Sequence, residues 1–213
     1  MDEAIWHPIV ALGTTAAIFL TLQFRRGAPT DVLFLAGLAV VTLTGVITPQ
    51  AALEGFAATD RFLFGSRPSL ADFGLYGQLH TLTTDPTPRG IAERCAPRTV
   101  HWVRRLHDAA GVEGEWQAAD APLRPAVRRL LALAGKYYLP YLAANRAAIE
   151  AGEATFHVKL DGRDYRQPVF RYQAKCFGFL QRRFAGLPDA ARAAVEPVLA
   201  ETGCLPWLAA GGA

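Results

Sequence analysis

The pattern of hydrophobic positions divides the chain into two parts near residue 60. Residues 4–24 contain no charged side chain over 21 positions, a length that can cross a hydrocarbon core of about 30 Å. A second uncharged run is apolar over the 16 residues 32–47 and then reaches Pro49. The pattern predicts two amino-terminal hydrophobic helices, both candidates for membrane spans.

A cleaved signal peptide is the alternative interpretation of the first hydrophobic run. Its start is acidic, with Asp2 and Glu3, and Arg25 and Arg26 stand where small residues would be expected at a cleavage site. The two arginines also favour a cytoplasmic loop between the runs, which would place the rest of the chain outside. The presence of three widely spaced cysteines instead favours a reducing compartment. We therefore prefer an uncleaved anchor with its orientation left open.

A soluble, helical pattern begins directly after residue 60. Ser69 and Asp72 have the spacing of a capping box, in which the serine hydroxyl and the acidic side chain each accept a backbone N–H bond at the start of a helix. The apolar positions of this helix predict that one face turns inward. That face comprises Leu70, Phe73, Tyr76 and either Leu79 or His80.

Four further helices and a hairpin are predicted from the same periodicities. Pro97 fits the first turn of a helix whose inward positions are Val100, Val103 and Leu106, with Trp102 at its margin. A long helical pattern covers residues 121–151 and should kink at Pro140. Residues 155–160 and 163–167 alternate around Asp161-Gly162, which predicts a β-hairpin. A helix with the stripe Phe170, Gln173, Phe177, Leu180 and Phe184 follows, and a last helix over 188–202 should stop at Gly203.

Charge and cysteine usage exclude several classes of function. Residues 1–60 hold two basic and five acidic side chains, whereas the remainder holds twenty basic and fourteen acidic ones. This excess is spread over several helices without basic runs, so no nucleic-acid partner is predicted, and attraction to anionic membrane lipid stays open. Cys95, Cys176 and Cys204 have no zinc-ligand spacing, so no metal site is predicted. For Cys176, a thiol activated by Lys175 and an inert, buried thiol are the two alternatives.

Candidate chemical groups are few. His80, His101, His107 and His157 suggest bases or ligands, but none has a carboxylate at a spacing that implies a shared site, so surface histidines are the simpler interpretation. A hydrophobic pocket is a candidate role for Tyr76, Tyr137, Tyr138 and Tyr141, with core packing as the alternative. No phosphate loop or nucleophile elbow is present in the sequence. No catalytic residue is therefore predicted.

The amino-terminal part resembles the first helical hairpin of the citrate-transporter-like, sodium-coupled anion permeases. The resemblance extends over residues 5–56 and rests on the arginine-containing loop before PTDV (residues 29–32) and on the string LTGVITPQAALEGF (residues 43–56). Transport sites of secondary transporters are built from broken helices deeper in the sequence. The resemblance therefore implies no transport residue here.

The second part resembles the all-helical carboxy-terminal domain of the glutathione S-transferase superfamily over residues 62–208. The resemblance rests on FLFGSRPSLADFGLYGQL (residues 62–79) and APRTVHWVR (residues 96–104), while the hairpin and FRYQAKC (residues 170–176) resemble an extension found in a bacterial branch. It implies that Ser69 and Asp72 serve folding. It also implies that glutathione binding needs a thioredoxin-like domain, and no such pattern is found before residue 62. The first two helices of the family's helical domain are not found there either.

Together these interpretations predict a mainly α-helical protein. Two hydrophobic, transmembrane helices in a permease-like hairpin (residues 1–58) precede a truncated transferase-like helical bundle with one small β-hairpin (residues 59–213). The expected role is a membrane-associated module in the bacterial inner membrane, with the helical domain in the cytoplasm. It would bind membrane lipid and a protein partner or a second copy, without cofactor or catalysis of its own. The alternatives are a soluble cytoplasmic protein, an enzyme completed by a partner's thioredoxin-like domain with glutathione as cofactor, an anion permease fragment, and a gene-fusion remnant without function.

Overall fold

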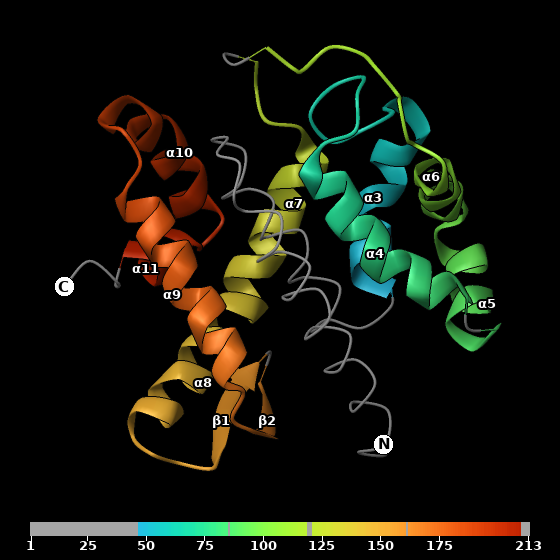
Figure 1. The fold of residues 1–213 in the computed structure, drawn as a ribbon. Coiled ribbons are helices and arrows are strands. Elements are labelled where there is room, and N and C mark those ends of the chain that lie inside the picture. Colours follow the sequence, from blue (N-terminus) through green and yellow to red (C-terminus); the bar gives the residue numbers. More distant parts are fainter. Residues whose placement is uncertain (1–46, 85, 119–120, 161, 210–213) are drawn as a thin grey trace.

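A mainly helical bundle with one two-stranded hairpin accounts for the residues that the computed structural model describes, which are 47–84, 86–118, 121–160 and 162–209 (Figure 1). Most of the two predicted membrane helices therefore lies outside the described residues. The elements follow one another as α3 (Ile47–Thr59), α4 (Leu70–Thr84), α5 (Pro86–Cys95), α6 (Pro97–His107), α7 (Pro125–Leu133), the π-helical turn η2 (Ala134–Tyr138), α8 (Leu139–Glu150), β1 (Thr155–Leu160), β2 (Arg163–Pro168), α9 (Arg171–Ala185), α10 (Asp189–Glu201) and α11 (Leu205–Ala209).

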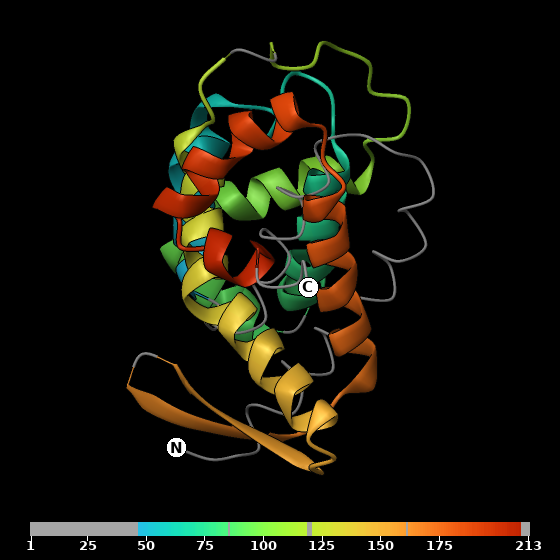
Figure 2. The same ribbon diagram turned by 90° about the vertical axis from the view of Figure 1, so that its left-hand side faces the viewer.

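Helix α7 connects the two sides of the bundle. Helices α3 to α6 pack together on one side of it, and α9 to α11 lie on the other, as Figure 1 shows. The hairpin extends from the far end of α8, which is clearest in the rotated view (Figure 2). Buried hydrophobic residues from both sides meet along α7, where Leu130 and Leu131 are almost fully buried.

Helix α3 is part of this core. Leu53 and Phe56 are buried, and the Phe56 ring meets Trp102 of α6 edge to face at a centroid distance of 6.1 Å. Trp102, expected at the margin of its helix, is instead fully buried and donates its indole N–H to the Arg61 carbonyl oxygen at 2.9 Å. The inward positions Val100, Val103 and Leu106 are confirmed. The last residues of the permease-like string therefore pack inside the helical domain.

The loop between α3 and α4 is packed into the core and does not form an open linker. Its side chains Phe62, Leu63 and Phe64 are all buried. Gln117 donates its backbone N–H to the Phe64 carbonyl at 2.6 Å, which joins this loop to the one before α7. The division predicted between residues 58 and 59 stays a prediction, but the structure packs both sides of it against one another.

The inward face of α4 differs from the predicted one. Its buried side chains are Ala71, Asp72, Leu75 and Leu79. Phe73 is 36% exposed, and Leu70 and Tyr76 are only partly buried. The Asp72 carboxylate accepts the Leu63 backbone N–H and thereby turns the side of the helix that carries Leu75 toward the core. Hydrophobic periodicity does not indicate this polar anchor, so the prediction was right for Leu79, wrong for Phe73, and only partly right for Leu70 and Tyr76, which are half-buried at the edge of the core.

The long helix predicted over residues 121–151 begins at Pro125 and is interrupted before Pro140. The turn η2 is π-helical, and Leu139 donates its N–H to the carbonyl of Ala134, five residues back. Proline has no N–H and its ring clashes with the carbonyl four residues earlier in an α-helix. The wider turn accommodates this proline at the start of α8, because π-turns shift the hydrogen-bond register by one residue.

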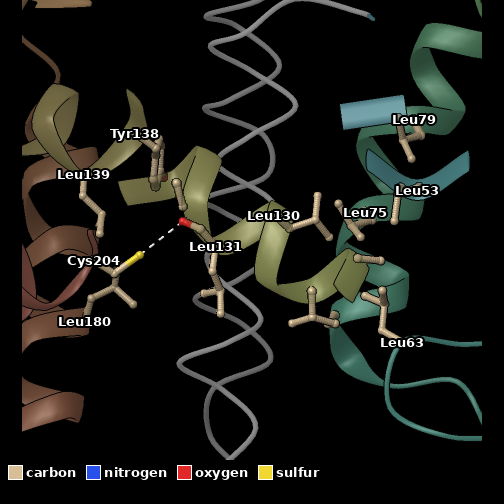
Figure 3. Packing of buried hydrophobic residues seen from close by; sticks show 14 of the residues in the cluster. Leu53, Leu63, Leu75, Leu79, Leu130, Leu131, Tyr138, Leu139, Leu180 and Cys204 are labelled. Atoms are coloured by element: carbon tan, nitrogen blue, oxygen red, sulfur yellow. Dashed lines mark hydrogen bonds between the residues drawn. The ribbon is translucent and has the colours of Figure 1, made fainter. Parts of the chain in front are cut away.

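The carboxy-terminal segment packs against this π-turn. A β-carbon built at Gly135 would lie 2.2 Å from the Thr202 carbonyl oxygen, so only glycine permits the close approach. The Cys204 thiol donates to the Leu131 carbonyl oxygen at 3.3 Å, between Leu139 and Leu180 (Figure 3). Gly203 ends the preceding helix with φ at 71°, as predicted, whereas the short α11 was not predicted.

The predicted β-hairpin is confirmed. Strands β1 and β2 pair antiparallel with Leu160 opposite Arg163, and Gly162 has a φ of 78°. Phe156 turns into the core, where it meets Tyr141 of α8 edge to face at 5.0 Å. Four of the five positions of the stripe predicted for α9 are confirmed, since Gln173, Phe177, Leu180 and Phe184 are buried, whereas Phe170 is partly buried at the N-cap. The mainly α-helical class with one hairpin is thus as predicted.

Candidate functional site

Ser69 and Asp72 form a reciprocal capping box at the start of α4. The Asp72 carboxylate accepts the Ser69 N–H at 2.8 Å, and the Ser69 hydroxyl accepts the Asp72 N–H at 3.3 Å. The same carboxylate accepts the Ser69 hydroxyl and, through its other oxygen, the Leu63 N–H at 2.8 Å. Both side chains are buried, and all of these polar groups are engaged with one another. The geometry is that of a folding device.

Burial dominates the protonation behaviour of Asp72. It raises the pKa of this carboxyl from 3.8 to about 6, although the hydrogen bonds from Ser69 and Leu63 act in the opposite direction. A carboxyl group with such a pKa is a candidate acid or base in general. Among the described residues, its hydrogen bonds come from the backbone N–H groups of Leu63 and Ser69 and from the Ser69 hydroxyl.

The four tyrosines proposed for a pocket do not form one group. Tyr138 and Tyr141 lie together, with ring centroids 6.5 Å apart. Tyr137, one residue from Tyr138, is partly buried beneath the Lys136 ammonium group, which lies 4.8 Å from its ring centroid. Tyr76 stands on α4 and contacts histidines instead. Their assignment to a shared pocket stays a prediction.

Tyr138 and Tyr141 belong to the packed end of the bundle near the hairpin. The Tyr141 hydroxyl donates to Gln173 of α9 at 3.0 Å, and its ring contacts Phe156 and Tyr165 at centroid distances of 5.0 and 5.8 Å. Burial raises the pKa of both Tyr138 and Tyr141 far above the ordinary value, and that of Tyr165 to about 12. These phenols therefore stay neutral, and they connect α8, α9 and the hairpin through ring packing and amide hydrogen bonds.

Tyr76, His80 and His107 form a ring cluster across α4 and α6, which we call the Tyr76–His80–His107 cluster. Tyr76 and His80 stack at a centroid distance of 5.0 Å, and the two imidazoles lie 5.3 Å apart. The Tyr76 hydroxyl group and Nδ1 of His107 are joined by a hydrogen bond of 2.7 Å. Of the four histidines weighed in the sequence, His101 and His157 are exposed and lie outside this cluster.

Sequence reasoning missed this cluster because its members are far apart in the chain. Tyr76 and His80 have helical spacing, but His107 comes from a different helix. Only the packing of α4 against α6 brings the rings together. One feature of the sequence could have suggested the cluster. His107 falls in the last turn of the helix predicted to begin at Pro97, where it can meet a neighbouring helix.

The cysteines differ in exposure. Cys95 is exposed, Cys176 is partly buried, and Cys204 is buried with its thiol on the Leu131 carbonyl. Burial raises the pKa of the Cys204 thiol, which makes it less reactive. In the part of the chain that the structure describes, no three His, Cys, Asp or Glu side chains are arranged to hold a metal ion. A search of the same residues finds no helix long and apolar enough to cross a membrane.

Helices α3 to α7 form the all-helical first half of the described chain. Residues 51–132, less than half of the 213 residues, match the family model for the glutathione S-transferase carboxy-terminal domain. This match supports the predicted transferase-like domain and begins within α3. The permease-like hairpin finds no support in the comparisons. No curated protein and no solved structure matches the chain.

Proposed function

We propose that the helical domain is a glutathione S-transferase-like module that acts by protein interaction and carries no catalytic group of its own. The supporting observation is that several of its buried polar side chains are hydrogen-bonded within the fold. Ser69 and Asp72 are committed to the start of α4, and the Tyr141 hydroxyl to Gln173. A transferase would need a hydroxyl or thiol group that faces glutathione. The side chains of Ser69, Asp72 and Tyr141 instead bind other groups of the protein itself.

Glutathione binding tests the non-catalytic part of this proposal. The full-length protein is titrated with glutathione by calorimetry and passed over immobilised glutathione, alone and with lysate of its source cells. We expect no heat of binding and no retention. Retention that free glutathione reverses, observed only with lysate, would instead support an enzyme completed by a partner's thioredoxin-like domain.

The interaction part is tested by the assembly state. Sedimentation velocity of the purified full-length protein, followed by crosslinking in cell extract, should show a second copy or a specific partner bound to the chain. A monomer at all concentrations that also gives no crosslinked product in extract would contradict the proposal.

We also propose that residues 4–24 anchor this module to a membrane. The support comes from the sequence, because 21 uncharged positions suffice for one span. The test is expression from the native gene with a carboxy-terminal tag, followed by carbonate washing of the membranes. A full-length band in the washed pellet is expected, whereas a shorter band in the supernatant would exclude an anchor.

A further inference from the structure

The His80 and His107 rings lie at a separation that is compatible with a shared metal ion. A metal ion binds imidazole nitrogen at about 2.0 Å, so two rings sharing an ion at a tetrahedral angle have centroids about 5 Å apart. The observed separation of the His80 and His107 centroids is 5.3 Å, with the ring planes inclined by 41°. We propose that His80 and His107 bind one divalent transition-metal ion of the imidazole-preferring class, namely Cu²⁺, Ni²⁺ or Zn²⁺.

The hydrogen bond to Tyr76 prepares His107 for this role. Nδ1 of His107 lies 2.7 Å from the Tyr76 hydroxyl oxygen. When Nδ1 carries the proton and donates to this oxygen, Nε2 presents its lone pair to a metal. Such outer hydrogen bonds fix the tautomer and orientation of metal-binding imidazoles. Tyr76 is therefore a positioning residue, and its ring also stacks on His80 at 5.0 Å.

The local field favours a cation. His107 is the last residue of α6, so its imidazole stands at the negative end of that helix dipole. Two arginines precede His107, but their guanidinium groups point elsewhere. Arg104 pairs with Glu93 at 3.4 Å, and Arg105 donates to the Asp60 carbonyl at 3.5 Å.

Exposure permits access and exchange. His107 is exposed and His80 is partly buried, so neither imidazole is sealed in the core of the described residues. Two protein ligands leave the remaining coordination positions to water, which distinguishes this site from closed structural sites with four protein ligands. Since a bound imidazole must be unprotonated, affinity is expected to fall in acid.

Copper titration of the full-length protein tests the proposal. The protein carries no polyhistidine tag, is treated with chelator, and is then titrated with Cu²⁺ by calorimetry. We expect one ion per chain. His80→Gln and His107→Gln should each weaken binding by more than about tenfold, and Tyr76→Phe by about tenfold, because loss of an outer hydrogen bond has effects of that size.

His101→Gln is the matched control, since His101 is exposed on α6 and lies outside the cluster. It should bind Cu²⁺ like the unsubstituted protein. Circular dichroism verifies that each variant is folded, and electron paramagnetic resonance of the copper complex should show nitrogen coupling from two imidazoles. Binding that survives in the His80→Gln/His107→Gln double variant, or a spectrum without imidazole nitrogen, would overturn the assignment.

Discussion

The Glu54 carboxylate of α3 accepts the backbone N–H of Thr99 in the first turn of α6 at 2.9 Å. It also accepts the Thr99 hydroxyl at 3.1 Å and, through its other oxygen, the Arg98 N–H at 3.1 Å. The first N–H groups of a helix have no partner within the helix, and Ala96 at the N-cap provides no side-chain bond. A residue from a helix more than forty positions earlier therefore caps α6.

Replacing Glu54 with alanine should lower the free energy of unfolding by about 1 to 2 kcal/mol, the usual value of an N-terminal cap. Glu54→Gln should lose less, because the amide oxygen still accepts one bond. The measurement is urea unfolding followed by circular dichroism. Glu93→Ala is the control, since Glu93 is an exposed acid in surface ion pairs and should show no measurable change. Equal effects at both positions would contradict the capping role.

The sequence predicted local features well where one short stretch carries the whole signal. The capping residues Ser69 and Asp72 and the helix start at Pro97 could be located in this way. The cap from Glu54 joins two helices far apart in the sequence, and the bond from Leu63 to Asp72 joins a loop to a helix. Hydrophobic periodicity indicates neither of them. Assigning residues 43–56 to a permease-like hairpin concealed Glu54, because its apolar neighbours fit both interpretations.

The capping box makes Asp72 a strong determinant of stability. Asp72→Ala would leave the Leu63 and Ser69 N–H groups buried without an acceptor, at a cost of about 3 kcal/mol at neutral pH. Ser69→Ala removes one hydroxyl and leaves the carboxylate in place, so its cost should be about 1 kcal/mol. Thermal and urea unfolding of the two variants would measure the difference. A smaller loss for Asp72→Ala than for Ser69→Ala would show that the aspartate does not anchor this loop.

Asp72 should also make stability depend on pH. Its folded pKa of about 6 exceeds the ordinary value of 3.8, so the unfolded chain loses this proton first as the pH rises. The free energy of unfolding that comes from keeping this carboxyl protonated is therefore complete below about pH 4. It is lost as the pH passes 6, by on the order of 2 to 3 kcal/mol. Subtracting the unfolding curve of Asp72→Asn at each pH isolates this group. A difference that grows with pH would mean that the hydrogen bonds outweigh burial.

Two glycines, Gly135 in the π-turn η2 and Gly77 in α4, should respond to substitution in opposite ways. Gly135→Ala places a methyl group against the Thr202 carbonyl, at a separation of 2.2 Å before relaxation, so it should cost about 1 to 3 kcal/mol. Gly77→Ala, in the middle of α4, meets no atom within 4 Å and should stabilise the helix by about 1 kcal/mol. Melting temperatures of the two variants test both signs. Stabilisation by Gly135→Ala would show that η2 and the segment near Thr202 do not approach so closely.

The orientation of α4 can be tested with two neighbouring side chains. Leu75 is 1% exposed, and truncation to alanine should cost about 2 to 5 kcal/mol because it leaves a cavity in the core. Phe73 is 36% exposed, so Phe73→Ala should cost less than about 1 kcal/mol despite the larger volume removed. Hydrophobic periodicity alone predicts the reverse order, with Phe73 inside. Urea unfolding of the two variants therefore decides between the two faces, and a larger loss for Phe73→Ala would mean that α4 turns the Leu70, Phe73 and Tyr76 side inward.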